Sequence, residues 1–170
     1  MLDFDFFHAR YKYDPISGLL TWRINTKGGG RAIPIGTVAG STVQTGHRRV
    51  MLSINRDGKQ RMYKAHRVIW LMMTGEWPRL EIDHIDGDGT NNAWANLRLA
   101  TRSQNNMNKR MQSNNSSGFK GERRNGSGWS AQIWLDRKGI WLGTFRTKQE
   151  AHAICCEARI KAYGPFVRNA

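Results

Sequence analysis

Four polar residues in the middle of the chain have the types needed to hydrolyse a phosphodiester bond. Asp83 and His84 are adjacent, and Asn96 and Asn105 follow at wider intervals. Carboxylate and amide oxygens are hard donors, so Asp83 and Asn105 together would suit one Mg²⁺ or Mn²⁺ ion, with water and phosphate oxygens in its other positions. A neutral His84 beside that ion could accept the proton of the attacking water near pH 7.

The residues around these side chains predict a strand, a turn, a second strand and a helix. A short apolar run and a Leu-Arg-Leu alternation indicate the strands, and the Gly, Asp and Asn residues between them indicate the turn. Thr101 or Ser103 is a suitable N-cap for the helix. The expected ranges are 82–85 and 97–99 for the strands, 86–92 for the turn and 104–110 for the helix.

Asp83 and His84 can act on one substrate only if the first strand bends at its end, because neighbouring residues of a strand point to opposite faces. The Asp-Gly-Asp-Gly sequence at 86–89 favours such a bend. We interpret the other polar residues here as turn formers rather than ligands. They are Asp86, Asp88, Asn91 and Asn92.

The stretch EIDHIDGDGTNNAWANLRLATRSQNN, residues 81–106, resembles the HNH nucleases of the phage and intron-encoded homing type, which have a ββα-metal core. The resemblance implies that Asp83 and Asn105 bind the metal and that His84 is the general base. It also implies that Asn96 pins the loop between the two strands. The third motif position is Asn105 rather than a histidine, which agrees with an oxygen-ligated ion.

Simpler roles stay open for these residues. Asp, His and Asn side chains in loops are commonly solvated or cap turns, and Asn96 could serve only as a turn residue. His66 could supply a second imidazole or contact a phosphate. A hydrogen-bonded structural histidine is the preferred interpretation of His66, and we assign it no catalytic role.

The charge of the chain points to a polyanionic partner. Its 170 residues include 27 Lys and Arg against 13 Asp and Glu, which gives a formal net charge of +14. Double-stranded DNA is therefore the expected partner, and no obligatory protein partner is evident. A membrane surface would also attract this charge, but no apolar run approaches the roughly 20 residues needed to span a bilayer.

The chain has no features of a secreted protein. Its N-terminus, MLDFDFFHARYKY, lacks the apolar stretch of a secretory signal. Cys155 and Cys156 are adjacent in a predicted helix, so neither a structural disulfide nor a zinc site is expected from them. We interpret them as small buried apolar residues. These features indicate the reducing cytoplasm of a bacterial or phage-infected cell.

The N-terminal third is expected to be rich in short strands. An aromatic cluster, a turn at 14–18 and a strand at 19–24 predict an initial hairpin, and the KGGGR segment at 27–31 is interpreted as a surface loop. An apolar helix at 65–74, bounded by Gly75 and Pro78, should be buried behind the nuclease strands. Further strands are expected at 38–40, 49–54 and 61–64. Their basic residues could line DNA or form an ordinary solvated face: Arg48, Arg49, Arg56, Lys59 and Arg61.

The C-terminal part predicts three antiparallel strands and one helix across their face. The strands are expected at 119–124, 129–135 and 140–145, and the helix at 148–163. Strand alternation places Ala131 and Ile133 against the helix, and Gln132 and Trp134 outward. The apolar stripe of the helix is expected to consist of Ala151, Ile154, Cys155, Ala158 and Ala162.

This part resembles the DNA-binding domain of the plant ethylene-response factors, the AP-two/ERF domain. The resemblance rests on SGFKG, WSAQI, WLGTF, TKQEA and YGPF, which span nearly all of residues 117–167. The implied DNA contacts are Lys120, Arg123, Gln132, Trp134 and Trp141, with Arg124 and Lys138 on phosphates. Several arginine positions of the plant proteins are Trp134 and Gly139 here, so the GC-rich specificity does not transfer. A small fold used for protein contact is the alternative.

The whole chain is therefore expected to be an α+β protein that carries a cleavage core and a separate DNA reader. The expected parts are a strand-rich region at 1–62, an HNH core at 63–110, a linker at 111–117 and the AP-two/ERF-like domain at 118–170. The expected function is a site-specific, homing-like DNA endonuclease that nicks one strand. A DNA-binding regulator with an inactive core, and a less specific phage nuclease for genome processing, are the alternatives.

Overall fold

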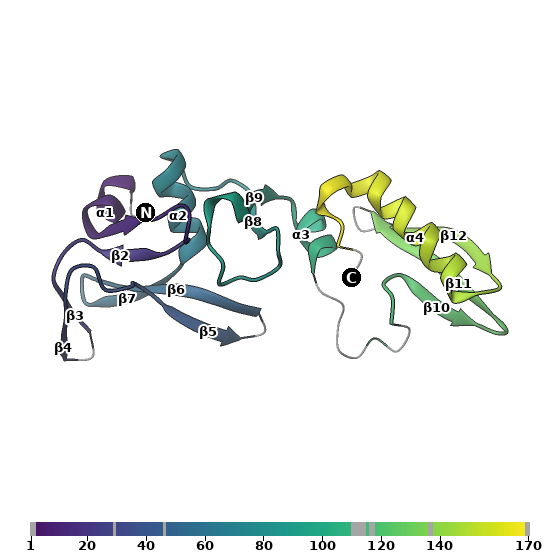
Figure 1. Ribbon diagram of the computed structural model, residues 1–170, viewed down its shortest axis with the longest axis horizontal. Helices are drawn as coiled ribbons and strands as arrows, with labels where there is room; N and C mark the ends of the chain where they lie inside the picture. The colour runs from purple at the N-terminus through teal and green to yellow at the C-terminus, as the bar shows by residue number, and fades with distance from the viewer. Residues whose placement is uncertain are drawn as a thin grey trace. The chain divides into compact units, whose positions relative to one another are not determined.

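Figure 1 shows the computed structural model of the chain, which describes residues 3–28, 30–45, 47–109, 115, 118–135 and 138–168. It divides into two compact units, Met1–Leu99 and Ala100–Ala170, and each is described here by itself. Both units mix helices with small antiparallel sheets, which confirms the expected α+β class. In the described part of the chain, every helix is too short or too polar to cross a bilayer.

The first unit begins with a helix that the sequence did not predict. Helix α1 (Phe4–Arg10) is capped by Asp3, whose side chain accepts a hydrogen bond from Phe6 N. Phe7 is fully buried and packs edge-on against Tyr63 and Trp77. This burial stabilises a helix that residue preferences alone do not favour. The predicted hairpin follows it, as β1 (Tyr11–Tyr13) paired with β2 (Leu20–Trp22).

Five further strands continue the first unit. The predicted surface loop at 27–31 is wrong in part, because β3 (Thr26–Gly28) pairs with β4 (Arg31–Ile33) there. A three-stranded sheet then has the order β5 (Ser41–Thr45), β6 (His47–Arg56) and β7 (Lys59–Lys64). Strand β5 was not predicted, and of the strand expected at 38–40 only an isolated bridge from Val38 to Thr21 forms.

Helix α2 (Ala65–Thr74) has the predicted bounds and ends at Gly75, whose amide donates to Leu71 O. It packs on the sheet of β6 and β7 and contributes much of the core. Strand β8 (Glu81–His84), the 3₁₀ turn Trp94–Asn96 and β9 (Leu97–Ala100) follow. Strands β8 and β9 pair with each other, as expected for the two strands of the proposed core.

The second unit contains a short helix, a three-stranded sheet and a long helix. Helix α3 (Arg102–Asn108) starts at Thr101, which forms a capping box with Gln104. It begins and ends two residues earlier than the sequence predicted. The sheet has the order β10 (Glu122–Asn125), β11 (Gly128–Leu135) and β12 (Lys138–Phe145). Helix α4 (Lys148–Tyr163) has the predicted bounds and packs on all three strands, and a 3₁₀ turn, Gly164–Phe166, follows it.

The buried stripe of α4 differs from the predicted one. Ala151, Cys155, Arg159 and Tyr163 are buried at four-residue intervals, whereas Ala162 is exposed and Ile154 and Ala158 are only half-buried. Arg159 can lie inside because its Nη2 donates to Lys120 O at 2.9 Å and its Nε to Cys155 O at 3.1 Å. A pattern of apolar residues does not reveal a buried arginine of this kind.

The four-part division at 62, 110 and 117 stays a prediction. The sequence boundary between the two compact units follows Leu99. The expected linker at 111–117 lies outside the described residues, apart from Asn115.

Candidate active site

The predicted bend lies directly after His84. His84 is the last residue of β8, and its carbonyl accepts a hydrogen bond from Gly87 N at 2.8 Å, which closes a turn. Ile85 N donates to Asn96 O at 2.9 Å, so this bond joins the two ends of the segment between β8 and β9. Asp83 and His84 are both buried, at 3% and 8% exposure. Each must therefore have partners inside the unit.

Asp83 is held by Arg98 of the neighbouring strand. Both Nε and Nη2 of Arg98 donate to Asp83 Oδ2 at 2.8 Å, and the two side chains are only 17% and 4% exposed. A charge-assisted pair that is shielded from water is strong and directional. The guanidinium therefore sets the orientation of the carboxylate. Sequence reasoning assigned Arg98 no site role, although its position in the second predicted strand opposite the first was an available signal.

His84 is oriented by Asn92. The two side chains meet at 3.0 Å through His84 Nε2 and Asn92 Oδ1. The amide nitrogen of Asn92 donates to Thr90 O at 3.5 Å, which directs its Oδ1 to the imidazole. Because an amide oxygen only accepts, Nε2 carries the ring proton and Nδ1 has the lone pair of a base. The prediction that Asn92 is only a turn former is therefore incomplete, since Asn92 is 3% exposed and faces the histidine.

Asn96 stabilises the turn between β8 and β9 through hydrogen bonds. Its Nδ2 donates to Asp86 Oδ1 at 2.9 Å and to Asn91 O at 2.8 Å, and its Oδ1 accepts from Asp86 N at 3.0 Å. Burial by itself would raise the pKa of Asp86. Hydrogen bonds from Asp88 N, Asn96 and Asn91 outweigh it, so that the pKa lies below its ordinary value. Asp86 therefore stays ionised as an internal anchor of the turn.

A second imidazole lies against His84. The rings of His66, in the first turn of α2, and His84 are 5.1 Å apart and nearly perpendicular. His66 is 9% exposed, and burial lowers its pKa to about 3, so it is neutral at physiological pH. Its Nδ1 has no hydrogen-bond partner among the described residues, so the hydrogen bond expected of this histidine does not involve Nδ1.

The N-terminal hairpin supports the loop that carries Asn92. Tyr13 Oη donates to Asn92 O at 2.8 Å, and burial raises the pKa of Tyr13 to about 12. Trp94 N donates to Pro15 O at 2.9 Å. A Cβ at Gly18 would lie 2.3 Å from Asn92 C and from Ala93 N, so only glycine permits this approach. The turn at 14–18 therefore does more than connect two strands.

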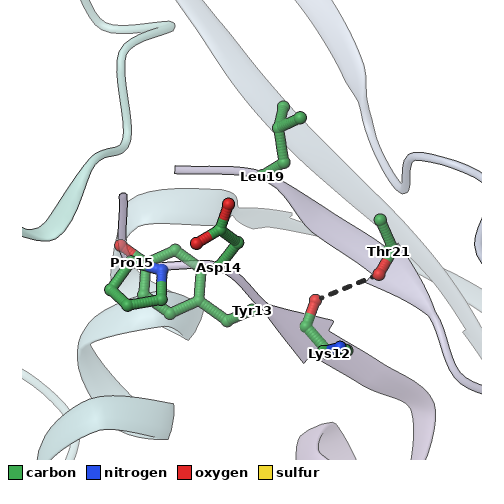
Figure 2. Close-up of a pocket in the computed structure, with 6 residues that line it drawn as sticks. All are labelled: Lys12, Tyr13, Asp14, Pro15, Leu19 and Thr21. Atoms are coloured by element: carbon green, nitrogen blue, oxygen red, sulfur yellow. Dashed lines mark hydrogen bonds between the residues drawn. The ribbon is translucent and has the colours of Figure 1, made fainter. Parts of the chain in front are cut away.

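A surface hollow of about 410 Å³ lies beside this hairpin (Figure 2). Its lining consists of Lys12, Tyr13, Asp14, Pro15, Leu19 and Thr21, and Thr21 Oγ1 donates to Lys12 O at 3.5 Å. The hollow contains none of the residues predicted to act in cleavage.

Asn105, the predicted second metal ligand, lies in α3 of the second unit, where its backbone N donates to Thr101 O at 2.9 Å. The pairing of Asn105 with Asp83 stays a prediction from their spacing. The described residues contain no group of three His, Cys, Asp or Glu side chains that could hold a metal. The two candidate ligands, a carboxylate and an amide oxygen, suit a hard ion such as Mg²⁺, which keeps several waters and phosphate oxygens around it.

The predicted DNA contacts of the second unit lie on two faces of its sheet. The register pairs Arg123 with Ser130, Gln132 with Trp141 and Trp134 with Gly139. Directly opposed residues share a face, so the outer face carries Arg123, Gln132, Trp134 and Trp141. Trp134 and Trp141 are 60% and 57% exposed.

Two other predicted DNA contacts, Arg124 and Lys120, differ from the four residues on the outer face. Arg124 is opposite Trp129, which packs in the core under α4, so it lies on the helix side of the sheet. The Lys120 ammonium donates to Arg168 O at 3.1 Å and to Lys109 O, and burial lowers its pKa. This arrangement favours a structural role for Lys120 over the predicted DNA contact.

Comparisons with known proteins found a family profile over the motif, a relative and a solved structure. The sequence profile described as HNH endonuclease matches residues 63–107. Protein 3.8 of Escherichia phage T7 is 33% identical over 101 residues, an alignment that covers 57% of this chain and 75% of that protein. A solved structure of the HNH homing endonuclease I-HmuI, titled for its DNA binding and cleavage, aligns with a TM-score of 0.42 and 21% identity. That alignment covers 63% of this chain and 55% of the other.

Proposed function

The chain belongs to the HNH endonuclease family, and we propose that it is a DNA endonuclease that hydrolyses a phosphodiester bond with His84 as general base. The observation that carries the proposal is the pair at the end of β8. Asp83 and His84 are both buried, and each is oriented by a separate partner, Arg98 and Asn92. Such fixed orientation is what an active site requires of its reacting groups.

His84 would take the proton of the attacking water through Nδ1. The bond from Nε2 to Asn92 Oδ1 keeps the ring in the tautomer that this step needs, and it also stabilises the imidazolium that forms. The neutral His66 ring packs edge-on against His84 and adds no competing positive charge.

Asp83 and Asn105 would hold one Mg²⁺ or Mn²⁺ ion. When bound, such an ion offsets charge on the scissile phosphate and on the departing 3′ oxygen. Arg98 would orient the Asp83 carboxylate for this task. Asn96, through its three hydrogen bonds, would keep the turn between the two strands closed.

The second unit would read DNA with the outer face of β11 and β12, as in the AP-two/ERF domain that it resembles. Exposed tryptophans are costly on a free surface, and Trp134 and Trp141 lie on one face with Arg123 and Gln132. The net charge of +14 supports a polyanionic partner. A cleavage core with a separate reader suggests homing-type site specificity, and one metal site per chain suggests nicking of one strand.

Nicking of supercoiled DNA tests the proposal. Wild-type protein with Mn²⁺ should convert supercoiled plasmid carrying the target to open circles, and ends mapped by sequencing should cluster at one site. His84→Ala should lower the rate at least a hundredfold, because the base is lost while DNA affinity stays within twofold. His8→Ala, a histidine of α1, is the control and should cleave normally. Unchanged turnover in His84→Ala would refute the assignment, and scattered ends would refute site specificity.

A further inference from the structure

Helix α3, which carries the proposed metal ligand Asn105, is too short to be stable by itself. It has seven residues, Arg102–Asn108, and the last turn of this described helix contains no basic side chain. Isolated helices of this length are marginal in water, and the last carbonyl groups of any helix need partners from outside it. The contacts that other parts of the second unit make with α3 therefore decide how firmly Asn105 is held.

The Lys120 side chain supplies a cation at the end of α3. Its ammonium donates a hydrogen bond to the carbonyl oxygen of Lys109, the C-cap residue of the helix. A positive charge at a helix C-terminus is favoured by the helix dipole, and this bond also satisfies a carbonyl that the helix leaves without an internal partner. Since Lys120 directly precedes β10, the bond connects α3 to the three-stranded sheet.

The segment after α4 also contacts α3. The same Lys120 ammonium donates to Arg168 O at 3.1 Å, and Arg168 N donates to Met107 O at 3.4 Å. The 3₁₀ turn Gly164–Phe166 packs against α3, and Figure 1 shows the two side by side. Lys120 thus bonds at the same time to α3 and to a segment that is distant from it in sequence.

Lys120 is itself fixed to the long helix of the unit. The buried Arg159 of α4 donates through Nη2 to Lys120 O at 2.9 Å. The Lys120 side chain is half-buried, and this burial, with Arg159 and Arg168 nearby, lowers its pKa. An ammonium that is partly withdrawn from water needs acceptors inside the protein. Two of its three N–H groups find them in Lys109 O and Arg168 O.

We propose that Lys120 is a positioning residue for cleavage, which holds α3 to the sheet of the second unit and so fixes Asn105 for metal binding. The proposal rests on the proposed function, because the position of Asn105 matters for cleavage only if Asn105 binds the ion. About one helical turn separates Asn105 from Lys109, so a loose helix end would move the amide oxygen. Lys120 then acts through α3 and not through a contact with DNA.

Hydrogen exchange of the full-length protein tests this anchor without metal or DNA. The wild-type amides of residues 102–109 should exchange at least a hundredfold more slowly than those of an unfolded chain. In Lys120→Met they should exchange at least tenfold faster than in the wild type, while the amides of β11 stay protected. Lys120→Gln, which also removes the charge, takes its place should Lys120→Met not fold.

Lys109→Met is the matched control for the exchange measurement. Lys109 contributes its backbone carbonyl to the bond and has an exposed side chain, so α3 should exchange as it does in the wild type. Unprotected α3 amides in the wild type would overturn the proposal. Equal exchange in the wild type and in the folded Lys120 variant would overturn it too.

Cleavage and DNA binding separate positioning from DNA contact. At saturating DNA, Lys120→Met should cleave at least tenfold more slowly and need several-fold more Mn²⁺ for its half-maximal rate, because the ligand is less well placed. Its dissociation constant for DNA should stay within twofold of the wild type. Weaker DNA binding, with a salt slope lower by about one and normal α3 exchange, would identify a phosphate contact and overturn the proposal.

Asn105→Ala distinguishes failure of this proposal from failure of the proposed function. It should slow cleavage as Lys120→Met does, but it should not speed the exchange of α3, since alanine is a good helix former. Faster exchange with normal cleavage in Lys120→Met would overturn the positioning role. Normal cleavage in Asn105→Ala would instead refute the proposed metal ligand, and the exchange data would still decide whether Lys120 holds α3.

Discussion

Asp83 and His84 are neighbours in sequence, yet each depends on a different part of the fold. Arg98 reaches Asp83 from β9, and Asn92 reaches His84 from the turn. His66 reaches His84 from α2. Because three separate segments meet at two adjacent residues, the geometry of the site depends on the packing of the whole first unit. Single substitutions in any of the three can therefore change it.

The buried His66 should make the stability of the protein depend on pH. Its pKa is about 3 when folded and 6.5 ordinarily, so protonation favours the unfolded chain. Stability should be complete above pH 6.5 and decline as the pH falls toward 3. One unit below 6.5, the loss is about 1.4 kcal/mol. Urea unfolding at pH 7.5 and 5.5 measures it.

His66→Leu is the matching variant for this measurement. It removes the titrating group, so the difference in unfolding free energy between the two pH values should be smaller than in the wild type by about 1.4 kcal/mol. The same difference in both proteins would contradict the burial of His66 as a neutral ring.

At the scale of elements, the turn between β1 and β2 supports the active-site loop. Gly18 has a φ of +74°, and a Cβ there would lie 2.3 Å from backbone atoms of Asn92 and Ala93. Gly18→Ala should therefore lower the unfolding free energy by about 2 kcal/mol or more, because backbone cannot yield as a side chain can. Urea unfolding gives the value.

Gly36→Ala is the control for this substitution. Its φ of +85° is similar, but a Cβ there would meet nothing within 4 Å. It should therefore carry only the conformational cost of a left-handed residue, about 1 kcal/mol. Equal losses in the two variants would show that the contact between the hairpin and the loop does not form.

Two adjacent arginines of β10 test the proposed DNA face. Both are exposed, but Arg123 shares the outer face with Trp134 and Trp141, whereas Arg124 lies on the helix side. Arg123→Ala should weaken DNA binding and reduce the slope of log affinity against log salt by about one. Arg124→Ala should change both much less. Titration of labelled duplex at several salt concentrations measures them, and equal effects would argue against the outer face as the reader.

For the molecule as a whole, the charge of +14 predicts DNA binding that weakens steeply with salt, whatever the sequence of the DNA. Cleavage requires more than this attraction. We expect EDTA to stop cleavage while circular dichroism and DNA binding persist, because the proposed ion serves catalysis and not folding. A cooperative loss of circular dichroism on chelation would identify a structural metal instead.

Several elements were predictable because their signals are local. Helix α2 ends at Gly75, and α4 starts at Thr147, whose capping box with Glu150 lies within three residues. Helix α1 and strand β5 were missed because tertiary burial stabilises them more than their own residue preferences. Arg159 was missed inside α4 for a related reason, since its partner carbonyl at Lys120 is distant in sequence.

The amino-acid sequence by itself determined the chemistry available to this protein: the Asp83-His84 pair, the spaced asparagines and the excess of positive charge. Only the tertiary structure decided how that chemistry is presented. Arg98 on Asp83, Asn92 on His84 and the burial of Arg159 against Lys120 O all arise from contacts between segments that are separate in the sequence. Residue types and local spacing are properties of the chain, whereas orientation, tautomer and burial depend on what the folded chain packs against each side chain.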